Sequence, residues 1–199
     1  MSHQKAPIDP FTADEKEAIL AKLSGQSYLF YLLAFETGLR TAELMGMKWS
    51  DIRGGKIHLE RTMVRTEYKD MKTKTTRSVA LSPRAIEELE NVVRHISGHF
   101  LANTKGDLLR DCAKLNDAWH DAIDDSEVRY RRPYNCRHTR ASLGLSAGQT
   151  PAWLANQLGH DLRTFFDKYA TYIGGDNDAA EMAKMISKKT PNRDKLGTK

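Results

Sequence analysis

Three short motifs and one tyrosine in this chain carry residue types that are suited to the attack of a hydroxyl on a phosphodiester. Arg40 lies in the stretch Thr-Gly-Leu-Arg-Thr-Ala-Glu-Leu, and Arg137 opens the motif Arg-His-Thr. His160 closes the motif Leu-Gly-His, and Tyr169 follows nine residues later. Arginine has a planar fork of N–H donors that matches phosphate oxygens, and a tyrosine hydroxyl can act as a covalent nucleophile. The motifs therefore predict a site at which a tyrosine attacks a phosphodiester held by two arginines.

These motifs resemble those of the tyrosine recombinases of the phage integrase type, over roughly residues 12 to 188. The resemblance implies that Arg40 and Arg137 bind the nonbridging oxygens of the scissile phosphate in DNA. It also implies that Tyr169 is the nucleophile, which becomes a 3′-phosphotyrosine, with Tyr172 as the rival candidate. A phenol with a pKa of about 10 needs such a cationic site to favour its ionised form.

Two further side chains take roles in the same resemblance. His160 would hydrogen-bond the phosphate and help to take the proton of the nucleophile, because imidazole titrates near neutral pH. Glu43 would orient the region around Arg40, and a simple helix-capping role for its carboxylate is an equal alternative.

The proton donor for the departing 5′ oxygen is expected on a β-hairpin. The hairpin lysine of the family matches Lys72, which would act as the general acid. Lys74 is the close competitor because it has the same parity along a strand. The register of a hairpin cannot be fixed from one sequence, so both lysines stay open.

The sequence departs from the family pattern at residue 134. The family usually has a histidine three residues before its second arginine, where this chain has Tyr134. On a helix, Tyr134 and Arg137 would share a face, so the tyrosine hydroxyl can still donate to a phosphate oxygen or hold the surroundings of the nucleophile. His138 is expected to point elsewhere on that helix than Arg137 and to have a packing or backbone-bonding role, with a catalytic role as the lesser alternative.

The composition favours one domain with a polyanionic partner. The 199 residues include 31 Lys and Arg against 26 Asp and Glu, with a net charge of +5 and a pI of about 9.1. Two basic runs flank the motif residues; they contain Arg61, Arg65, Lys69, Lys72, Lys74 and Arg77, and Arg129, Arg131, Arg132, Arg137 and Arg140. Together the runs favour a nucleic acid partner over a merely solvated surface.

Other residue types exclude several classes of protein. Cys112 and Cys136 are too few for a disulfide framework or a cysteine-rich zinc site. A Ser-Gly pair interrupts the helix between His95 and His99, so we expect no metal there, and the chemistry requires no cofactor. The longest apolar run, residues 28–35, is far too short to span a bilayer, and no apolar signal core is found near the amino terminus. We expect a soluble, cytoplasmic protein.

The chain is expected to fold as an α+β domain that is mainly α-helical, with a small three-stranded antiparallel sheet. Residues 1–11 would form a flexible lead or linker, residues 12–188 the tyrosine recombinase catalytic domain, and residues 189–199 a basic tail. The strands are predicted between residues 49 and 81 from short alternating pieces, which contain Ile57 and Leu59, Thr62 and Val64, and Val79 and Leu81.

Caps and apolar stripes predict the helices. Thr12 and Glu15 form a capping box for a helix to about Leu23, and an apolar helix over residues 28–35 ends at Gly38 in a left-handed conformation. Ser82 and Pro83 open a helix whose apolar stripe is Ile86, Leu89, Val93 and Ile96. Further helices are predicted along the stripe Leu108, Cys112, Leu115, Trp119 and Ile123, over residues 133–147, from Thr150 and Pro151, and over residues 178–188.

The resemblance implies a site-specific recombinase that cleaves and rejoins duplex DNA at specific attachment sites. It implies a homotetramer on two duplexes, allows accessory DNA-bending proteins, and expects the helix over residues 178–188 to pack either on a neighbouring subunit or on its own domain. A type IB topoisomerase uses the same chemistry on one duplex, but the Leu-Gly-His motif and the spacing disfavour it. A DNA-binding regulator with a helix-turn-helix around Arg137 would leave Tyr169 and Lys72 without a role.

Overall fold

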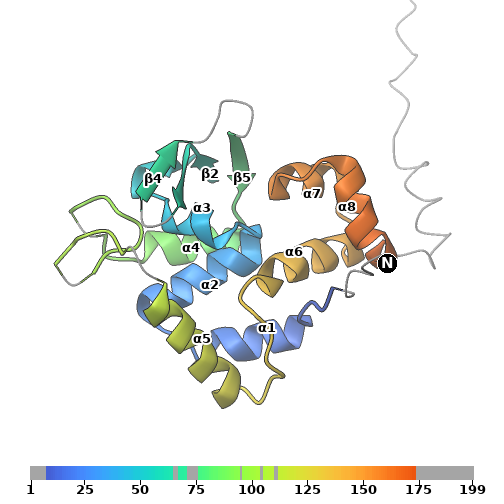
Figure 1. The fold of residues 1–199 in the computed structure, drawn as a ribbon, viewed down its shortest axis with the longest axis horizontal. Coiled ribbons are helices and arrows are strands. Elements are labelled where there is room, and N and C mark those ends of the chain that lie inside the picture. The colour runs from blue at the N-terminus through green and yellow to red at the C-terminus, as the bar shows by residue number, and fades with distance from the viewer. Residues whose placement is uncertain are drawn as a thin grey trace, which may run out of the picture.

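The computed structural model describes residues 8–64, 67–70, 76–94, 96–103, 105–109 and 112–173. Helices surround the buried helix α2 (Gly25–Thr37), with the strands on one side and a carboxy-terminal group of helices on the other, as Figure 1 shows. Within these ranges no helix is long and apolar enough to cross a membrane. The helix predicted over residues 178–188 lies outside the described residues.

The first helix begins at the predicted capping box. In α1 (Ala13–Leu20) the Thr12 hydroxyl accepts a hydrogen bond from the Glu15 N–H, and the Glu15 carboxylate accepts one from the Thr12 N–H. The two bonds satisfy backbone donors that a helix start otherwise leaves unpaired. The helix ends at Leu20 rather than at the predicted Leu23.

A glycine ends α2 and fixes the path of the chain into the first arginine motif. Gly38 adopts φ 66°, a left-handed conformation that glycine reaches at little cost. A Cβ atom at this position would lie 2.3 Å from Leu158 Cδ2, so the glycine also permits close packing against a distant helix. Arg40 then caps the short helix α3 (Thr41–Met45). The predicted helix and its left-handed end are confirmed.

The predicted three-stranded antiparallel sheet is present, but one of its strands was assigned wrongly. The sheet has the order β1 (Ile52–Arg53), β2 (Lys56–Leu59) and β5 (Arg77–Ala80), with Ile57 opposite Val79. The strand that contains Thr62 is β3 (Arg61–Val64), which pairs with β4 (Glu67–Asp70) in a separate two-stranded sheet. The partner of β3 is the adjacent strand β4, whose polar sequence has no alternating apolar pattern, so alternation did not indicate this strand.

The helices predicted from Ser82, from residue 133 and from Thr150 all begin within two residues of those starts: α4 (Pro83–Glu90), α6 (Asn135–Ser146) and α7 (Pro151–Leu158). Beyond the end of α4, Val93 and Ile96 are 97% and 99% exposed, so the buried stripe ends at Leu89.

Two other helices differ from the prediction. Helix α5 (Ala113–Asp125) begins later than its predicted stripe, because Leu108 forms an isolated β-bridge with Ala102. Helix α8 (Leu162–Tyr169) was not predicted. Two 3-10 turns, Trp49–Asp51 and Ala170–Tyr172, complete the described elements.

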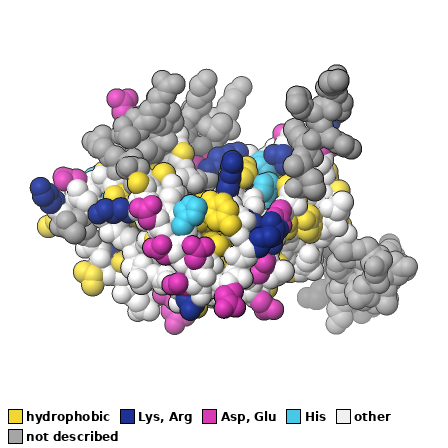
Figure 2. Space-filling view, turned by 60° about the horizontal axis from the view of Figure 1, so that its bottom comes forward, with side chains coloured by type: hydrophobic (Ala, Val, Ile, Leu, Met, Phe, Trp, Pro, Cys, Tyr) yellow, Lys and Arg dark blue, Asp and Glu magenta, His cyan; other side chains and the backbone are white. Residues whose placement is uncertain are grey.

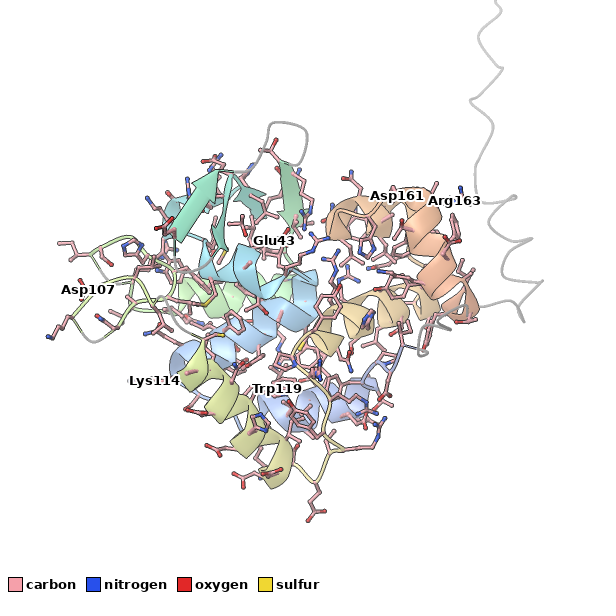
Figure 3. All side chains as sticks on the ribbon, viewed as in Figure 1. Glu43, Asp107, Lys114, Trp119, Asp161 and Arg163 are labelled. Carbon is pink, nitrogen blue, oxygen red and sulfur yellow. The ribbon has the colours of Figure 1, made fainter. Side chains whose placement is uncertain are left out.

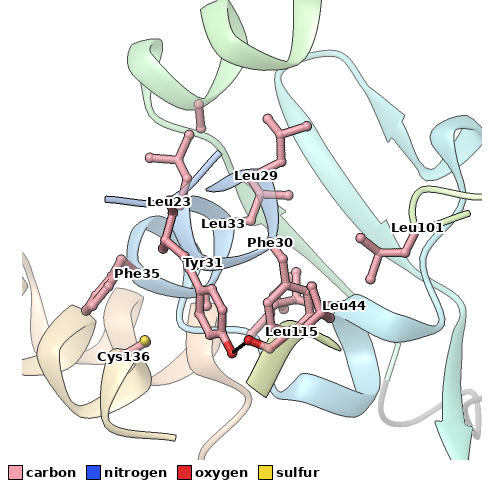
Figure 4. Close-up of a cluster of buried hydrophobic side chains, with 14 of the residues drawn as sticks. Leu23, Leu29, Phe30, Tyr31, Leu33, Phe35, Leu44, Leu101, Leu115 and Cys136 are labelled. Atoms are coloured by element: carbon pink, nitrogen blue, oxygen red, sulfur yellow. Dashed lines mark hydrogen bonds between the residues drawn. The ribbon is translucent and has the colours of Figure 1, made fainter. Parts of the chain in front are cut away.

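The buried side chains form two clusters of unequal size. The larger core joins α1, α2, α4, α5 and the sheet, and the hydroxyl of Tyr31 at its centre donates to the carbonyl of Leu115 over 2.9 Å (Figure 4). The smaller core joins α6, α7 and α8 through Ala141, Leu145, Leu154, Ala155, Leu158, Phe165 and Tyr169. Helix α6 contributes to both cores, and the second arginine motif lies on it.

One side of the molecule is acidic. Figure 2 turns the side with α1 and α5 toward the viewer, and Asp and Glu side chains are spread across it. Helix α5 exposes four of them, Asp117, Asp121, Asp124 and Asp125. A polyanion would be repelled from this side, whereas the motif residues lie on the opposite side, where β5 faces α7 (Figure 1).

Candidate active site

Arg137 is the buried centre of the site. Its side chain is 1% exposed, and it donates to the carbonyl oxygen of Gly38 over 2.7 Å and to the carbonyl oxygen of Leu158. These carbonyls end α2 and α7, so the guanidinium connects three helices. Burial, together with the positive charge of Arg40, lowers the pKa of Arg137 to about 10, and the side chain stays charged at neutral pH.

A buried carboxylate organises the other cations. Glu43 is 3% exposed and lies where α3, β5 and α7 meet (Figure 3). It forms a bidentate ion pair with Arg77, with N–O distances of 3.0 and 3.1 Å. It also accepts hydrogen bonds from the backbone N–H and the guanidinium of Arg40 over 2.8 and 3.1 Å. Burial alone would raise the pKa of Glu43, but its hydrogen bonds and charge contacts with Arg77 and Arg40 hold that pKa below its ordinary value. Both expected roles, helix capping and orientation of Arg40, therefore occur in one side chain.

Arg77 and Gln157 attach α7 to the edge of the sheet. The Arg77 Nε donates to the Gln157 carbonyl over 3.0 Å, and the Gln157 side chain accepts from the Ala80 N–H over 2.7 Å. Gly159 ends α7 with φ 65°, and a Cβ atom there would lie 2.8 Å from the Arg77 guanidinium. The sequence motifs gave no role to Arg77 or Gln157. No local signal identifies them, because their partners lie far away along the chain.

Arg40 differs from the other two arginines because it reaches the surface. Its side chain is 43% exposed, whereas that of Arg77 is 10% exposed. The carboxylate of Glu43 holds one end of the guanidinium, and the exposed part stays available to an anion from solution. Arg40 and Arg137 are close enough for the charge of one to lower the pKa of the other. Such a concentration of positive charge favours an anionic ligand.

Two buried N–H groups beside these arginines have no acceptor in the part of the chain that the structure describes. They are Arg137 Nε and His160 Nδ1. His160 Nε2 lies 2.9 Å from an N–H of Arg137; a guanidinium can only donate, so Nε2 is the acceptor and Nδ1 carries the hydrogen. Burial, with the charges of Arg137, Lys168 and Arg40, lowers the pKa of His160 to about 4, so the ring is neutral. Unsatisfied buried donors cost about 1 to 3 kcal/mol each, and a phosphate oxygen would satisfy them.

Tyr169 is buried in the smaller core, at the end of α8. It is 0% exposed, its ring stacks against His160 with centroids 6.1 Å apart, and it packs against Phe165 at 5.0 Å. Burial raises the pKa of Tyr169 to about 12 although the charge of Arg137 lowers it, so the phenol is protonated at neutral pH. The rival Tyr172 lies in the next turn and packs on the outside of the same core.

His138 makes a contact that the sequence did not indicate. Its Nδ1 lies 2.9 Å from the hydroxyl oxygen of Tyr169, so the histidine is directed at the predicted nucleophile. The two residues are on different helices, α6 and α8, and helical spacing within α6 alone could not indicate the contact.

Tyr134 precedes α6 and caps its amino end. The ring is 46% exposed and packs edge-on against His138, with centroids 5.1 Å apart. The Tyr134 side chain therefore contacts His138, which in turn contacts the predicted nucleophile Tyr169. The backbone N–H of Arg137 donates to the carbonyl oxygen of Tyr134 over 3.1 Å. Tyr134 lies close to the arginine motif, as predicted, but it precedes the helix instead of lying on it.

In the basic runs, most of the residues that the structure describes are ion-paired or half-buried. Arg129 and Arg131 pair with Asp9, and Arg131 also pairs with Glu15. In the other run Arg61 pairs with Asp51 over 2.7 Å, as Arg77 does with Glu43. Arg140 is half-buried and donates to the Glu36 carbonyl and to Gln149. These described residues of the runs therefore do not form a free positive surface. Lys72 and Lys74 lie outside the described residues.

Solved structures share this fold at low sequence identity. The Tn1549 transposon integrase, solved with circular intermediate DNA, aligns over 93% of this chain and 69% of its own length, with a TM-score of 0.68 and 20% identity. The catalytic domain of bacteriophage HP1 integrase aligns over 94% of this chain and 99% of its own, with a TM-score of 0.61 and 17% identity. The helical fold with its small sheet is that of tyrosine recombinase catalytic domains.

Sequence comparison gives the family. A profile of the phage integrase family matches residues 10–172, and the chain belongs to that family. The prophage integrase IntR of Escherichia coli (strain K12) is 26% identical over 202 residues, which cover 85% of this chain and 49% of the relative. This chain spans about half the length of the curated relatives that it matches.

Proposed function

We propose that this chain is the catalytic part of a site-specific DNA recombinase, which cleaves and rejoins duplex DNA through a 3′-phosphotyrosine intermediate. The observation that carries the proposal is a pair of buried N–H donors, Arg137 Nε and His160 Nδ1, which have no acceptor among the described residues and lie beside the protonated phenol of Tyr169. With the exposed part of Arg40, they would bind the nonbridging oxygens of one phosphate. Membership of the phage integrase family supports the same assignment.

The proposed reaction uses the charges of the site in two ways. Arg40 and Arg137 are held before DNA arrives, so their donors stabilise the extra negative charge of the five-coordinate phosphorus without reorganising. The Tyr169 oxygen attacks phosphorus and displaces the 5′ oxygen of the next nucleotide. Lys72 is proposed as the general acid that protonates this oxygen, with Lys74 as the competitor. The 5′ hydroxyl of the partner strand then reverses the step.

The proposed substrate is duplex DNA at specific attachment sites. Strand exchange between two duplexes requires four catalytic chains, and we propose a homotetramer assembled on DNA, with accessory DNA-bending proteins where the sites are far apart. Since the substrate is cellular DNA, the proposed location is the cytoplasm. The acidic side with α1 and α5 would face away from the duplex (Figure 2).

The test uses a nicked suicide duplex with the attachment sequence of the element that encodes the chain. Cleavage next to the nick releases a short fragment, so the covalent protein–DNA adduct accumulates and is measured on a denaturing gel. The proposal predicts an adduct with the unaltered chain and none with Tyr169→Phe, which still binds the duplex. DNA binding without any adduct would indicate a DNA-binding regulator instead. Holliday junctions from paired sites would distinguish a recombinase from a topoisomerase.

A further inference from the structure

The only described side chain within hydrogen-bond distance of the Tyr169 oxygen is His138. Its Nδ1 atom lies 2.9 Å from that oxygen, and the centroids of the two rings are 5.7 Å apart. The ring of Tyr134 packs edge-on against the same imidazole at 5.1 Å. The imidazole thus contacts two tyrosines, and its Nδ1 is directed at the atom that would attack phosphorus.

The direction of this hydrogen bond follows from the protonation of both partners. Burial lowers the pKa of His138 to about 4, with contributions from Lys168 and Arg137, so the imidazole is neutral and one of its nitrogens has a free lone pair. The phenol of Tyr169 is protonated, because burial raises its pKa to about 12. A buried hydroxyl hydrogen without an acceptor is costly. The arrangement that satisfies both groups has the Tyr169 hydroxyl donating to Nδ1.

His160 is not available for the same task in this geometry. Its lone pair on Nε2 faces an N–H of Arg137 at 2.9 Å, and its hydrogen is on the buried Nδ1. His160 can therefore donate to a phosphate oxygen, but its basic nitrogen is already occupied. The resemblance assigned two tasks to His160, a hydrogen bond to the phosphate and uptake of the tyrosine proton. In this geometry His160 can perform the first task, and His138 is placed for the second.

We propose that His138 is a catalytic residue: its Nδ1 accepts the hydroxyl proton of Tyr169 as the phenol oxygen attacks phosphorus. This inference rests on the proposed function, and it names the proton acceptor of that reaction. At residue 134, where an imidazole is usual in the family, this chain has Tyr134, whose ring packs against the His138 imidazole.

In the proposed reaction the tyrosine proton moves to His138 during cleavage and returns during rejoining. In cleavage the O–H bond of Tyr169 breaks, a bond between its oxygen and phosphorus forms, and the bond between phosphorus and the 5′ oxygen breaks. The proton moves to His138 Nδ1, and the 5′ oxygen receives a proton from the general acid. The negative phosphate favours the imidazolium that forms. In rejoining, the imidazolium returns its proton to the tyrosine oxygen as the phosphorus–tyrosine bond breaks.

The test compares cleavage rates of variants on the nicked suicide duplex under single-turnover conditions. His138→Asn keeps an amide near the position of Nδ1 but cannot take up the proton at neutral pH. We expect it to slow adduct formation by about 100- to 10,000-fold, and His138→Ala should be as slow. Added imidazole should accelerate His138→Ala at least tenfold and leave Tyr169→Phe inactive. His58→Asn, on β2 and hydrogen-bonded to Ser78, is the matched control and should cleave normally.

Each outcome decides between the proposal and its rivals. Cleavage by His138→Asn within about threefold of the unaltered chain would mean that His138 only holds the tyrosine, and the proposal would be wrong. No rescue of His138→Ala by imidazole would also overturn it. Absence of any adduct with the unaltered chain would instead remove the proposed function, whatever His138 does. Duplex binding and thermal unfolding of each variant are measured alongside, so a folding defect is recognised.

A second measurement requires no substitution of His138. In protein labelled with nitrogen-15 at histidine, the chemical shifts of the ring nitrogens report which nitrogen carries the hydrogen. The proposal predicts that His138 has its hydrogen on Nε2 and a bare Nδ1, with a shift that changes in Tyr169→Phe. A hydrogen on Nδ1 would overturn the proposal even if every variant failed to fold.

Discussion

The site has two parts that are held in different ways. The arginine part, which comprises Arg40, Glu43, Arg77 and Arg137, is fixed by ion pairs and backbone carbonyls next to the larger core. The tyrosine part, which comprises His138, His160 and Tyr169, consists of neutral rings packed on or beside the smaller core. The two parts meet where Arg137 touches His160.

The difference between the two parts corresponds to the task that each would have in the proposed reaction. Charges that stabilise a transition state act best when they are already oriented, and the contacts of the arginine part orient them without DNA. A nucleophile that was ionised before the phosphate arrived would be costly to bury, so the tyrosine part is kept neutral. The arginine part is therefore charged before DNA binds, whereas the tyrosine part would become charged only during the proposed reaction.

Within the arginine part, the largest effect is expected from Arg137→Lys, which keeps the charge but removes the fork. Lysine cannot replace the donors to the carbonyls of Gly38 and Leu158 and also face a phosphate, so cleavage should fall by about 100- to 1,000-fold. Single-turnover cleavage and urea unfolding measure the two consequences. Arg40→Lys, at an exposed position, should lose cleavage but not stability. Near-normal cleavage by Arg137→Lys would remove Arg137 from the proposed phosphate site.

The next effect concerns the carboxylate that organises the arginine part. Glu43→Gln leaves Arg77 buried without its counter-charge, so we expect a loss of about 3 to 5 kcal/mol in the free energy of unfolding. Glu17→Gln is the matched control, because its ion pair with Arg84 is exposed and should contribute less than about 1 kcal/mol. Equal losses in the two variants would show that the arginine part is not held as described.

The same carboxylate gives a pH dependence whose sign is fixed. The pKa of Glu43 is lower in the folded chain than in the unfolded one, so its contribution is fully present above the unfolded value of about 4.3. It is lost as the pH falls through the lower folded value. The difference in unfolding free energy between the unaltered chain and Glu43→Gln should therefore shrink in acid below that pH. A difference that stays constant from pH 7 to pH 3 would contradict the assignment.

A smaller effect is expected at the glycine that ends α7. Gly159 and Gly148 both have positive φ, 65° and 76°, so alanine at either position meets a backbone cost of about 1 to 2 kcal/mol. Only at Gly159 would the added Cβ lie 2.8 Å from the Arg77 guanidinium, whereas none of the surroundings lies within 4 Å at Gly148. Gly159→Ala should therefore be the less stable variant and the slower one in cleavage. Equal stability would show that Arg77 can move without consequence.

The smallest effect is expected from Tyr134→His. This substitution restores the residue that is usual in the family, at an exposed position where the ring packs against His138. Cleavage should stay within about tenfold of the unaltered chain, measured on the same suicide duplex. Complete loss would mean that the contact between Tyr134 and His138 is itself required.

The sequence predicted the parts of the fold that depend on neighbouring residues. The capping box at Thr12, the left-handed end at Gly38 and the helix start at Ser82 all form as predicted, because each is decided within a few residues. The partner of the strand at Thr62 was predicted wrongly, because the adjacent strand β4 is polar and has no alternating apolar pattern. The exposure of Val93 was missed because helical spacing did not show that the helix ends at Glu90.

In the candidate site, too, local motifs indicated some residues, whereas contacts between distant residues were not predicted. The motifs indicated Arg40, Arg137, His160 and Tyr169, and the structure brings Arg137 next to His160 and His160 next to Tyr169. The contact of His138 with the nucleophile spans 31 residues and two helices, so no local pattern contains it. The pairing of Arg77 with Glu43, and the ion pairs that neutralise the basic runs, were equally out of reach of the sequence.

The most direct test of the account is the identity of the residue that becomes joined to DNA. The adduct from the nicked suicide duplex is digested with a nuclease and a protease, and the peptide that keeps a 3′-phosphonucleotide is sequenced by mass spectrometry. The account predicts a single modified residue, Tyr169, whose hydroxyl already faces His138. Attachment at Tyr172, or at any other residue, would contradict it.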